Sequence, residues 1–305
     1  MKKLIALMLV LAMVLSFAAC GKKPDEPKQD EPKPQEQPVA KTYDDYMKMD
    51  INDLKKEIKT IAAGKLTVAT SPDFAPYEFY VVDEKGNAQL AGFDMDLAKY
   101  IAEYLGLTAD IIPMDFDGTL AELAAKKVDV SLAGYSPDPD RMDKMDFSDI
   151  YYMGGQSFCV SKANENKFAA LADANNKAVK VAAQTASIQE KLANENTPDA
   201  DIVSLQKVTD IIAELITGKI DGAFIETAVA ETYAKNYPDL VVKFPVPYDA
   251  EGSAVGVSKD NAALLAGINK AIAEALKSGK MDEFVATAND LSSGDNVYEG
   301  LLENK

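Results

Sequence analysis

Short apolar runs alternate with segments that carry apolar residues at helical spacing along most of this 305-residue chain. Residues 66–70 and 128–133 have the composition of buried strands, and between them residues 94–105 place apolar side chains on one helical face. Asp94 at the start of this helix and Gly106 after it are typical of helix ends. Because strand and helix alternate, we expect an α/β fold with mainly parallel sheets covered by helices.

Further elements extend this alternation to both halves of the chain. The first half is expected to contain a helix over residues 44–63, a strand near Ile111 and a helix over residues 119–126. The second half is expected to contain strands at 178–183 and 220–225 and helices at 187–194, 210–217 and 228–235.

Two segments of the chain are alike. Residues 122–132, ELAAKKVDVSL, align without a gap with residues 214–224, ELITGKIDGAF, and both predict a helix, a turn and a strand. Either the chain contains an internal repeat, or both segments converged on a common helix-to-strand connection. If they are a repeat, the loops that follow the two strands lie at equivalent places in two lobes and face each other across a cleft.

The N-terminus has the pattern of an export signal. Lys2 and Lys3 precede an apolar run that is too short to span a membrane, and two alanines lie directly before Cys20. These residues resemble a bacterial lipobox, so we expect residues 1–19 to be a lipoprotein signal peptide and Cys20 to carry lipid, with palmitate among its acyl chains. The alternative is an ordinary signal peptide with a chance cysteine.

The segment that follows is expected to be a tether. Residues 20–42 comprise the lipid-bearing cysteine and a stretch with five prolines, no aromatic residue and charges of both signs, which cannot bury apolar surface. The remaining body of about 260 residues is long enough for two domains. We expect residues 296–305 to form a tail.

The composition excludes several kinds of chemistry. The formal charge of −17 disfavours binding to nucleic acid and to anionic lipid surfaces. The chain has no histidine, which excludes His-based triads and metal clusters. Once Cys20 is lipidated, Cys159 has no disulfide partner and is expected to be a small buried hydrophobe. The aspartates that follow Ser136 lack the glycine and closing glutamate of an EF-hand loop, so no metal and no cofactor are expected.

Residues 133–152 carry the strongest candidate for ligand chemistry. Arg141 is the only arginine in the chain, and it follows Ser136 in the loop that leaves the predicted strand 128–133. Its planar guanidinium can pair with a carboxylate through two hydrogen bonds, which a lysine ammonium does poorly. We expect Arg141 to bind the carboxylate of a small molecule. The alternative is a surface arginine in a weak ion pair.

The corresponding loop of the second half offers a carboxylate, Glu226. Ligands of open α/β sheets bind at the carboxyl ends of strands, where both Arg141 and Glu226 are expected. A cation on one lobe and an anion on the other suit a zwitterion such as a free α-amino acid, because each buried charge needs a partner.

Three other residues are candidates for the same site. Ser187 begins a predicted helix whose exposed N–H groups can bind a carboxylate, or it caps only its own helix. Phe74 and Phe116 either stack on the ligand and cover its ammonium or belong to the core.

Several motifs together resemble the family 3 extracellular solute-binding proteins, which feed polar amino acids to ABC importers. The resemblance covers about residues 65–288. It rests on GFDMDLAKYIAEYLG from Gly92, DFDGTLAELAAKKVDVSLAGYSPDPDR ending at Arg141, MDFSDIYY from Met145, AAQTASIQEKL from Ala182 and GKIDGAFIETAVAE from Gly218.

This resemblance implies a two-lobed fold of the type II periplasmic-binding-protein kind. The chain would cross the hinge twice, near residues 158–162 and near residues 248–253. The implied segments are an N-terminal helix (43–63), lobe 1 (64–158 plus 252–295, with a helix at 261–277) and lobe 2 (159–251).

The resemblance also implies roles for the candidate residues. The α-carboxylate of the ligand would bind Arg141, the α-ammonium would bind Glu226, and the remaining contacts would come from Phe74, Phe116, Gly134, Ser136 and Ser187. Glu226 stands where aspartate is usual, and Gly134 where some members have serine. Ser71 stands where members that prefer basic side chains often have aspartate, so a neutral polar amino acid is the expected ligand.

We therefore expect an extracytoplasmic, membrane-anchored monomer that closes on one amino acid and delivers it to an ABC permease. One alternative is an enzyme on the same scaffold, related to the periplasmic dehydratases, with Glu226 as general acid or base. Another is an amino-acid sensor without a transport role.

Overall fold

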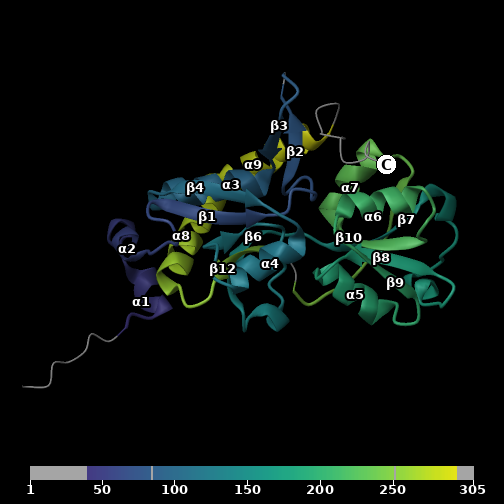
Figure 1. The fold of residues 1–305 in the computed structure, drawn as a ribbon, viewed down its shortest axis with the longest axis horizontal. Coiled ribbons are helices and arrows are strands. Elements are labelled where there is room, and N and C mark those ends of the chain that lie inside the picture. The colour runs from purple at the N-terminus through teal and green to yellow at the C-terminus, as the bar shows by residue number, and fades with distance from the viewer. Residues whose placement is uncertain (1–39, 84, 251, 294–305) are drawn as a thin grey trace, which may run out of the picture. The chain divides into compact units, whose positions relative to one another are not determined.

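The computed structural model describes residues 40–83, 85–250 and 252–293, which are built around two five-stranded sheets (Figure 1). The predicted signal peptide 1–19, Cys20, nearly all of the linker 20–42 and the tail 296–305 lie outside these residues. Within the described residues, no helix is both long and apolar enough to cross a membrane.

The first sheet has the strand order β4-β1-β5-β12-β6. Its strands are β1 (Lys65–Thr70), β4 (Thr108–Pro113), β5 (Val130–Ser131), β6 (Met145–Tyr152) and β12 (Ser253–Ser258). β1 pairs in parallel with β4 and β5, whereas β12 is antiparallel to both of its neighbours.

The second sheet repeats this plan with the order β11-β7-β10-β8-β9. Its strands are β7 (Gln156–Ser161), β8 (Lys180–Gln184), β9 (Asp201–Leu205), β10 (Gly222–Glu226) and β11 (Leu240–Pro245). β8 pairs in parallel with β9 and β10, and β7 is antiparallel to both of its neighbours. The two similar sequence segments lead into β5 and β10, which hold the same place in the two sheets. The predicted α/β fold with mainly parallel sheets is confirmed.

Helices cover both faces of the first sheet. Successive residues of β1 point to opposite faces, so Val68 packs in the apolar cluster of α3 (Phe93–Leu105) and α8 (Ala262–Ser278), while Ala69 packs in the cluster of α4 (Phe116–Ala124). We call this sheet and the helices packed on it the first lobe. It also includes α9 (Lys280–Ser292) and the hairpin of β2 (Phe79–Val82) and β3 (Ala88–Ala91).

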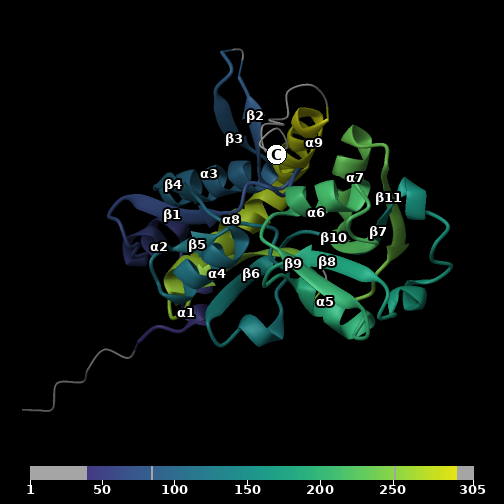
Figure 2. The same cartoon turned by 45° about the vertical axis from the view of Figure 1, so that its right-hand side comes forward.

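The second lobe is the second sheet with three helices. On β8, Val181 packs in the cluster of α5 (Ile188–Asn196), and Ala182 faces α6 (Val208–Ile216) and α7 (Thr227–Asn236). Both views show α5 on one side of the second sheet and α6 and α7 on the other (Figures 1 and 2). Among the residues that the structure describes, short 3₁₀ helices form at η1 (Pro139–Arg141), η2 (Lys162–Asn164) and η3 (Leu171–Ala174).

The predicted helix over residues 44–63 is wrong, because the chain forms two short helices there, α1 (Tyr43–Lys48) and α2 (Ile51–Glu57). The break has a local cause. Met49 is extended, and the Asp50 side chain accepts a hydrogen bond from the Asn52 N–H at 2.8 Å, which starts a new helix. Aspartate favours this capping position over a helix interior.

α1 and α2 are packed parts of the first lobe. Leu54 is fully buried in a cluster with Ala263 and Ala266 of α8. The Asn269 amide of α8 also donates to the Tyr43 hydroxyl at 2.8 Å. The segment that follows the linker is therefore held by core contacts.

The first crossing between the lobes lies earlier than predicted. β6 ends in the first sheet and β7 begins in the second, so the chain crosses at residues 153–155 and not at 158–162. A Cβ atom at Gly154 would lie 2.6 Å from Glu226 Oε1 and 2.8 Å from the Tyr77 hydroxyl, so any side chain here would require these groups to shift. The second crossing joins β11 to β12, across residues 246–252. We propose the predicted ranges for the two lobes with one change: the boundary between the first part of lobe 1 and lobe 2 lies at residues 153–155.

Candidate functional site

Arg141 lies at the end of η1, in the loop that follows β5. Asp138 starts this short helix, since its Oδ1 accepts from the Asp140 N–H at 3.0 Å. The guanidinium carbon of Arg141 lies 5.9 Å from the centre of the Phe116 ring and 5.8 Å from that of Tyr135. These two rings meet edge to face at 5.4 Å. Aromatic faces of this kind attract a cation and hold its plane in position.

The guanidinium of Arg141 has one hydrogen bond to the protein. Its Nη2 donates to the carbonyl oxygen of Ala186, in the second lobe, at 2.9 Å. None of the salt bridges formed by residues 40–83, 85–250 and 252–293 includes Arg141. Burial lowers the pKa of Arg141 below its usual value. Four N–H donors of a partly buried cation thus form no hydrogen bond with a carboxylate of the described residues, although the nearby Asp138 carboxylate attracts the charge.

Phe74 packs on Gly134 at the carboxyl end of β5. Gly134 has φ +58°, and a Cβ there would lie 2.7 Å from Phe74 Cε1. The Gly134 N–H donates to Asp94 Oδ2 at 3.0 Å. Both Phe74 and Phe116 are buried in apolar clusters, so each ring also takes the core role that the sequence allowed.

The two candidate serines are both buried but are held differently. The Ser187 hydroxyl accepts from the Glu190 N–H at 3.1 Å and donates to the Gln184 carbonyl oxygen at 2.6 Å, so it caps α5. The residue before it, Ala186, has φ +62°, a left-handed conformation that costs an alanine about 1 kcal/mol or more. The backbone carbonyl of Ser136 accepts from the Asp138 N–H at 2.8 Å.

Glu226 ends β10 and is only 3% exposed. Its Oε2 accepts from the Val229 N–H at 2.8 Å, and its Oε1 accepts from the Gly155 N–H at 3.2 Å. Burial raises the pKa of Glu226 to about 7, and these hydrogen bonds oppose the rise. The carboxyl therefore caps α7 and touches the first crossing between the lobes.

The predicted residues fall into three groups, and Tyr77 lies beside two of them. Phe116, Arg141 and the Ala186 carbonyl next to Ser187 form one group, and Phe74 with Gly134 forms a second. The Tyr77 ring lies 5.3 Å from that of Phe74, and its hydroxyl lies beside the Glu226 carboxyl and accepts from Ser253 Oγ at 3.2 Å. Arg141 and Glu226 make no ion pair with each other. Tyr77 was not among the predicted site residues, although it belongs to an aromatic-rich loop.

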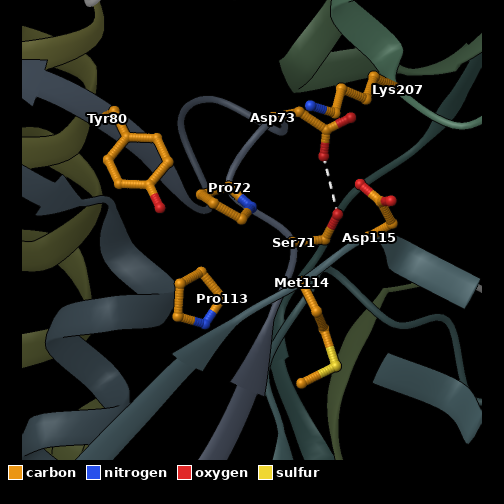
Figure 3. Close-up of a pocket in the computed structure, with 8 residues that line it drawn as sticks. All are labelled: Ser71, Pro72, Asp73, Tyr80, Pro113, Met114, Asp115 and Lys207. Carbon is orange, nitrogen blue, oxygen red and sulfur yellow. Dashed lines mark hydrogen bonds between the residues drawn. The ribbon is translucent and has the colours of Figure 1, made fainter. Parts of the chain in front are cut away.

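A cavity of about 420 Å³ opens at the carboxyl ends of β1 and β4 (Figure 3). Its lining residues are Ser71, Pro72, Asp73, Tyr80, Pro113, Met114, Asp115 and Lys207. Asp115 directly precedes Phe116, so the cavity adjoins the group around Arg141. Two carboxylates and one ammonium line it. Strand ends of open α/β sheets are where ligands bind.

Asp73 is one of several lining residues that were not predicted from the sequence. Its carboxylate accepts hydrogen bonds from Ser71 Oγ at 2.9 Å and from two groups of the second lobe, Gln184 Nε2 at 3.1 Å and the Val208 N–H at 2.7 Å. No local sequence pattern could predict these hydrogen bonds of Asp73, because Gln184 and Val208 lie 111 and 135 residues away in sequence.

Known proteins resemble this chain in sequence and in structure. ArtP, an arginine-binding extracellular protein of Bacillus subtilis strain 168, is 33% identical over 225 residues, which cover 72% of this chain and 84% of ArtP. AbpA, an amino-acid ABC transporter substrate-binding protein of Streptococcus pneumoniae Canada MDR_19A solved with bound L-arginine, is 32% identical. Its TM-score is 0.73, over 80% of this chain and 100% of AbpA.

A second similar structure extends the comparison. The ancestral amino-acid-binding protein AncCDT-1, a precursor of cyclohexadienyl dehydratase, is 31% identical with a TM-score of 0.67, over 78% of this chain and 98% of AncCDT-1. The sequence model of the bacterial extracellular solute-binding proteins, family 3, matches residues 66–287. This match covers most of the chain and agrees with the paired-sheet fold, so the resemblance seen in the motifs is confirmed and the chain belongs to family 3 of the bacterial extracellular solute-binding proteins.

Proposed function

We propose that this protein binds a free α-amino acid between its lobes and delivers it to an ABC permease. In this proposal Arg141 binds the α-carboxylate and Glu226 accepts the α-ammonium. Phe74, Phe116, Gly134, Ser136 and Ser187 supply the remaining contacts. Relatives named as amino-acid-binding proteins of ABC transporters support the proposal.

The observation that carries the proposal is the guanidinium of Arg141. It is partly buried against two aromatic rings and, within the described chain, donates to one carbonyl oxygen and to no carboxylate. A partly buried charge without a directly bonded ionic partner is costly, which favours an anion from outside the protein. A carboxylate matches the unused donors of the guanidinium in a bidentate pair.

Glu226 supports the ammonium half of the proposal. Its carboxyl is buried at the end of β10, opposite in charge to Arg141, and beside the chain crossing that must move when the lobes close. Ionisation above its pKa of about 7 would place a negative charge where the ligand nitrogen needs one.

For the ligand side chain we propose a basic amino acid. The cavity in Figure 3 holds Asp73 and Asp115 against one lysine, Lys207, so its formal charge is negative. A cationic side chain would offset this charge. ArtP is named as arginine-binding and AbpA was solved with L-arginine, and both agree with this choice.

We also propose that lipid on Cys20 holds the protein outside the cytoplasm. This rests on the Ala-Ala-Cys pattern after a short apolar run and on the proline-rich tether that follows. Mass spectrometry of the mature protein tests it, and a Cys20 without glycerol-linked lipid would contradict it.

Calorimetric titration of the chain from Lys41 onward with the twenty amino acids tests the binding proposal. One-to-one binding of L-arginine or L-lysine is expected in the wild type. Arg141→Ala should abolish it, and Arg141→Lys should weaken it because the fork is lost. Lys144→Ala, an exposed change in the same loop, is the control and should bind like wild type. Folded protein freed of carried-over ligand that binds no amino acid would overturn the proposal.

A dehydratase-like enzyme is the second candidate, because a buried carboxyl with a pKa of about 7 suits acid–base chemistry and AncCDT-1 is a precursor of an enzyme. Steady product formation that is lost in Glu226→Gln would favour it. A sensor would bind the ligand but support no uptake by cells that express the candidate permease.

A further inference from the structure

We propose that Asp73 is a latch between the lobes: its carboxylate, carried by the first lobe, caps the N-terminus of α6 in the second lobe and holds the candidate binding cleft closed. The ligand used in this inference rests on the proposed function, whereas the contacts between the lobes do not depend on it.

Asp73 reaches the second lobe at three points. Its Oδ2 accepts from the Val208 N–H at 2.7 Å and from Gln184 Nε2 at 3.1 Å, and its backbone carbonyl accepts from the Tyr233 hydroxyl at 3.2 Å. These partners belong to α6, β8 and α7, which together form one side of the second lobe. The side chain is 5% exposed, so water does not replace these bonds while the lobes are in contact.

The second lobe leaves a place for this carboxylate. The first N–H groups of a helix lack intrahelical partners and need an acceptor. The N-cap residue of α6 is Lys207, whose side chain carries no acceptor, and no side chain at that position caps the helix. An acid at a helix start also interacts favourably with the helix dipole. Asp73 supplies from the first lobe the acceptor that the N-cap of α6 lacks.

The other carboxylate oxygen of Asp73 is held within the first lobe, so the side chain can keep its orientation whether the lobes are closed or open. Asp73 Oδ1 accepts from Ser71 Oγ at 2.9 Å, within the same loop of the first lobe (Figure 3). Separation of the lobes would break all three bonds to the second lobe and leave the Ser71 bond in place. Burial raises the pKa of Asp73 to about 6, so the group is mostly ionised at neutral pH and can accept both N–H bonds.

Asp73 lies beside the candidate ligand-binding groups, but it is proposed to affect ligand release through closure of the lobes and not through direct contact with the ligand. Asp73 lines the cavity next to Asp115, but its Oδ2 is already occupied by protein donors. Loss of a latch weakens the closed state, so it mainly speeds ligand release and changes the encounter step less. From the loss of charge-assisted hydrogen bonds we expect Asp73→Ala to raise the dissociation rate of L-arginine roughly 10- to 100-fold.

The test uses the full-length protein with two readouts. Stopped-flow measures L-arginine dissociation, and spin labels at the exposed positions Lys99→Cys and Lys177→Cys measure the distance between the lobes with and without L-arginine. Cys159 is buried, which limits labelling at that site. Asp73→Ala should lengthen the distance and speed dissociation. Gln184→Ala should change the distance and the dissociation rate in the same direction but less. The double variant should change both by less than the two single effects combined, because the two residues share one hydrogen bond.

Ser71→Ala is the matched control, because it removes the bond within the loop and leaves the three bonds between the lobes. It should leave the distance between the labels as in wild type; only this distance serves as the control, because Ser71 lines the cavity proposed for the ligand side chain. Asp73→Asn keeps one acceptor oxygen, so its label distance and dissociation rate should lie between those of wild type and Asp73→Ala. If the alanine variant does not fold, Asp73→Asn replaces it in the test. An unchanged distance and rate in Asp73→Ala, or an equal change of the distance in Ser71→Ala, would overturn the latch. If wild type binds no amino acid, the proposed function fails, and the label distance alone decides the latch.

Discussion

Replacing Gly134 with alanine probes the packing beneath the candidate site. The residue has φ +58°, and an added Cβ would lie 2.7 Å from Phe74 Cε1 and 3.4 Å from a Tyr77 ring carbon. The left-handed backbone alone should cost an alanine roughly 1 kcal/mol. The Phe74 ring must also move, because carbon atoms pack at about 3.5–4.0 Å, and overpacking of this kind costs about 1–3 kcal/mol.

Gly218 provides a matched control for the backbone term. It has φ +75° with no heavy atom within 4 Å of an added Cβ, so Gly218→Ala should cost only the backbone strain. Chemical denaturation followed by circular dichroism should therefore show Gly134→Ala to be less stable than Gly218→Ala by about 1–3 kcal/mol. Gly134→Ala should also weaken L-arginine binding, since it displaces a proposed wall of the ligand site.

A second variant identifies the colliding group. Phe74→Leu removes the ring edge that meets the added Cβ, so the double variant Phe74→Leu with Gly134→Ala should be more stable than the sum of the single effects allows. The reasoning is refuted if Gly134→Ala and Gly218→Ala lose the same free energy of unfolding. Additive effects of Phe74→Leu and Gly134→Ala would likewise contradict contact between these two residues.

Three other predictions concern Glu226, α2 and the cavity. The pKa of Glu226 is raised from 4.5 to about 7, so the folded state binds this proton more tightly and the free energy of unfolding should fall as pH rises through this interval. Glu226→Gln should reduce this decrease in the free energy of unfolding, and the exposed control Glu195→Gln should not. The same pH dependence in wild type and both variants would contradict the prediction. Leu54→Ala, at a fully buried position, should cost about 2–5 kcal/mol in denaturation, against under about 1 kcal/mol for Ile61→Ala, whose residue is 52% exposed; similar losses would mean that α2 does not pack. In calorimetry, Asp115→Asn should weaken L-arginine binding more than L-glutamine binding, and an equal loss for both would argue against a cationic side chain in the cavity.

Local sequence patterns predicted much of the secondary structure, for a physical reason. The strand and helix expected at 220–225 and 228–235 correspond to β10 (Gly222–Glu226) and α7 (Thr227–Asn236), because apolar periodicity reports directly which faces are buried. The same method failed at residues 44–63. Apolar spacing continues across Asp50 there, but a capping hydrogen bond of one aspartate outweighs the periodicity and divides the helix.

The candidate site divides in the same way. The single arginine pointed to Arg141 from composition alone, and the local motif at Ser187 allowed the N-cap role that the structure has. The contacts of Arg141 with two rings and the Ala186 carbonyl depend on residues from three segments and two lobes. No spacing within one segment could have predicted them.

The sequence by itself determined what depends on neighbours along the chain: the strand–helix alternation, the repeated helix–turn–strand unit, the family motifs and the presence of one guanidinium and one carboxylate after corresponding strands. The tertiary structure alone decided which groups meet. Asp73 caps a helix that begins 135 residues later, and Gly154, where the chain crosses between the lobes, lies directly beside Glu226 and Tyr77. Periodicity measures burial of a face and carries no record of partners, so contacts between distant segments emerge only when both sheets are assembled.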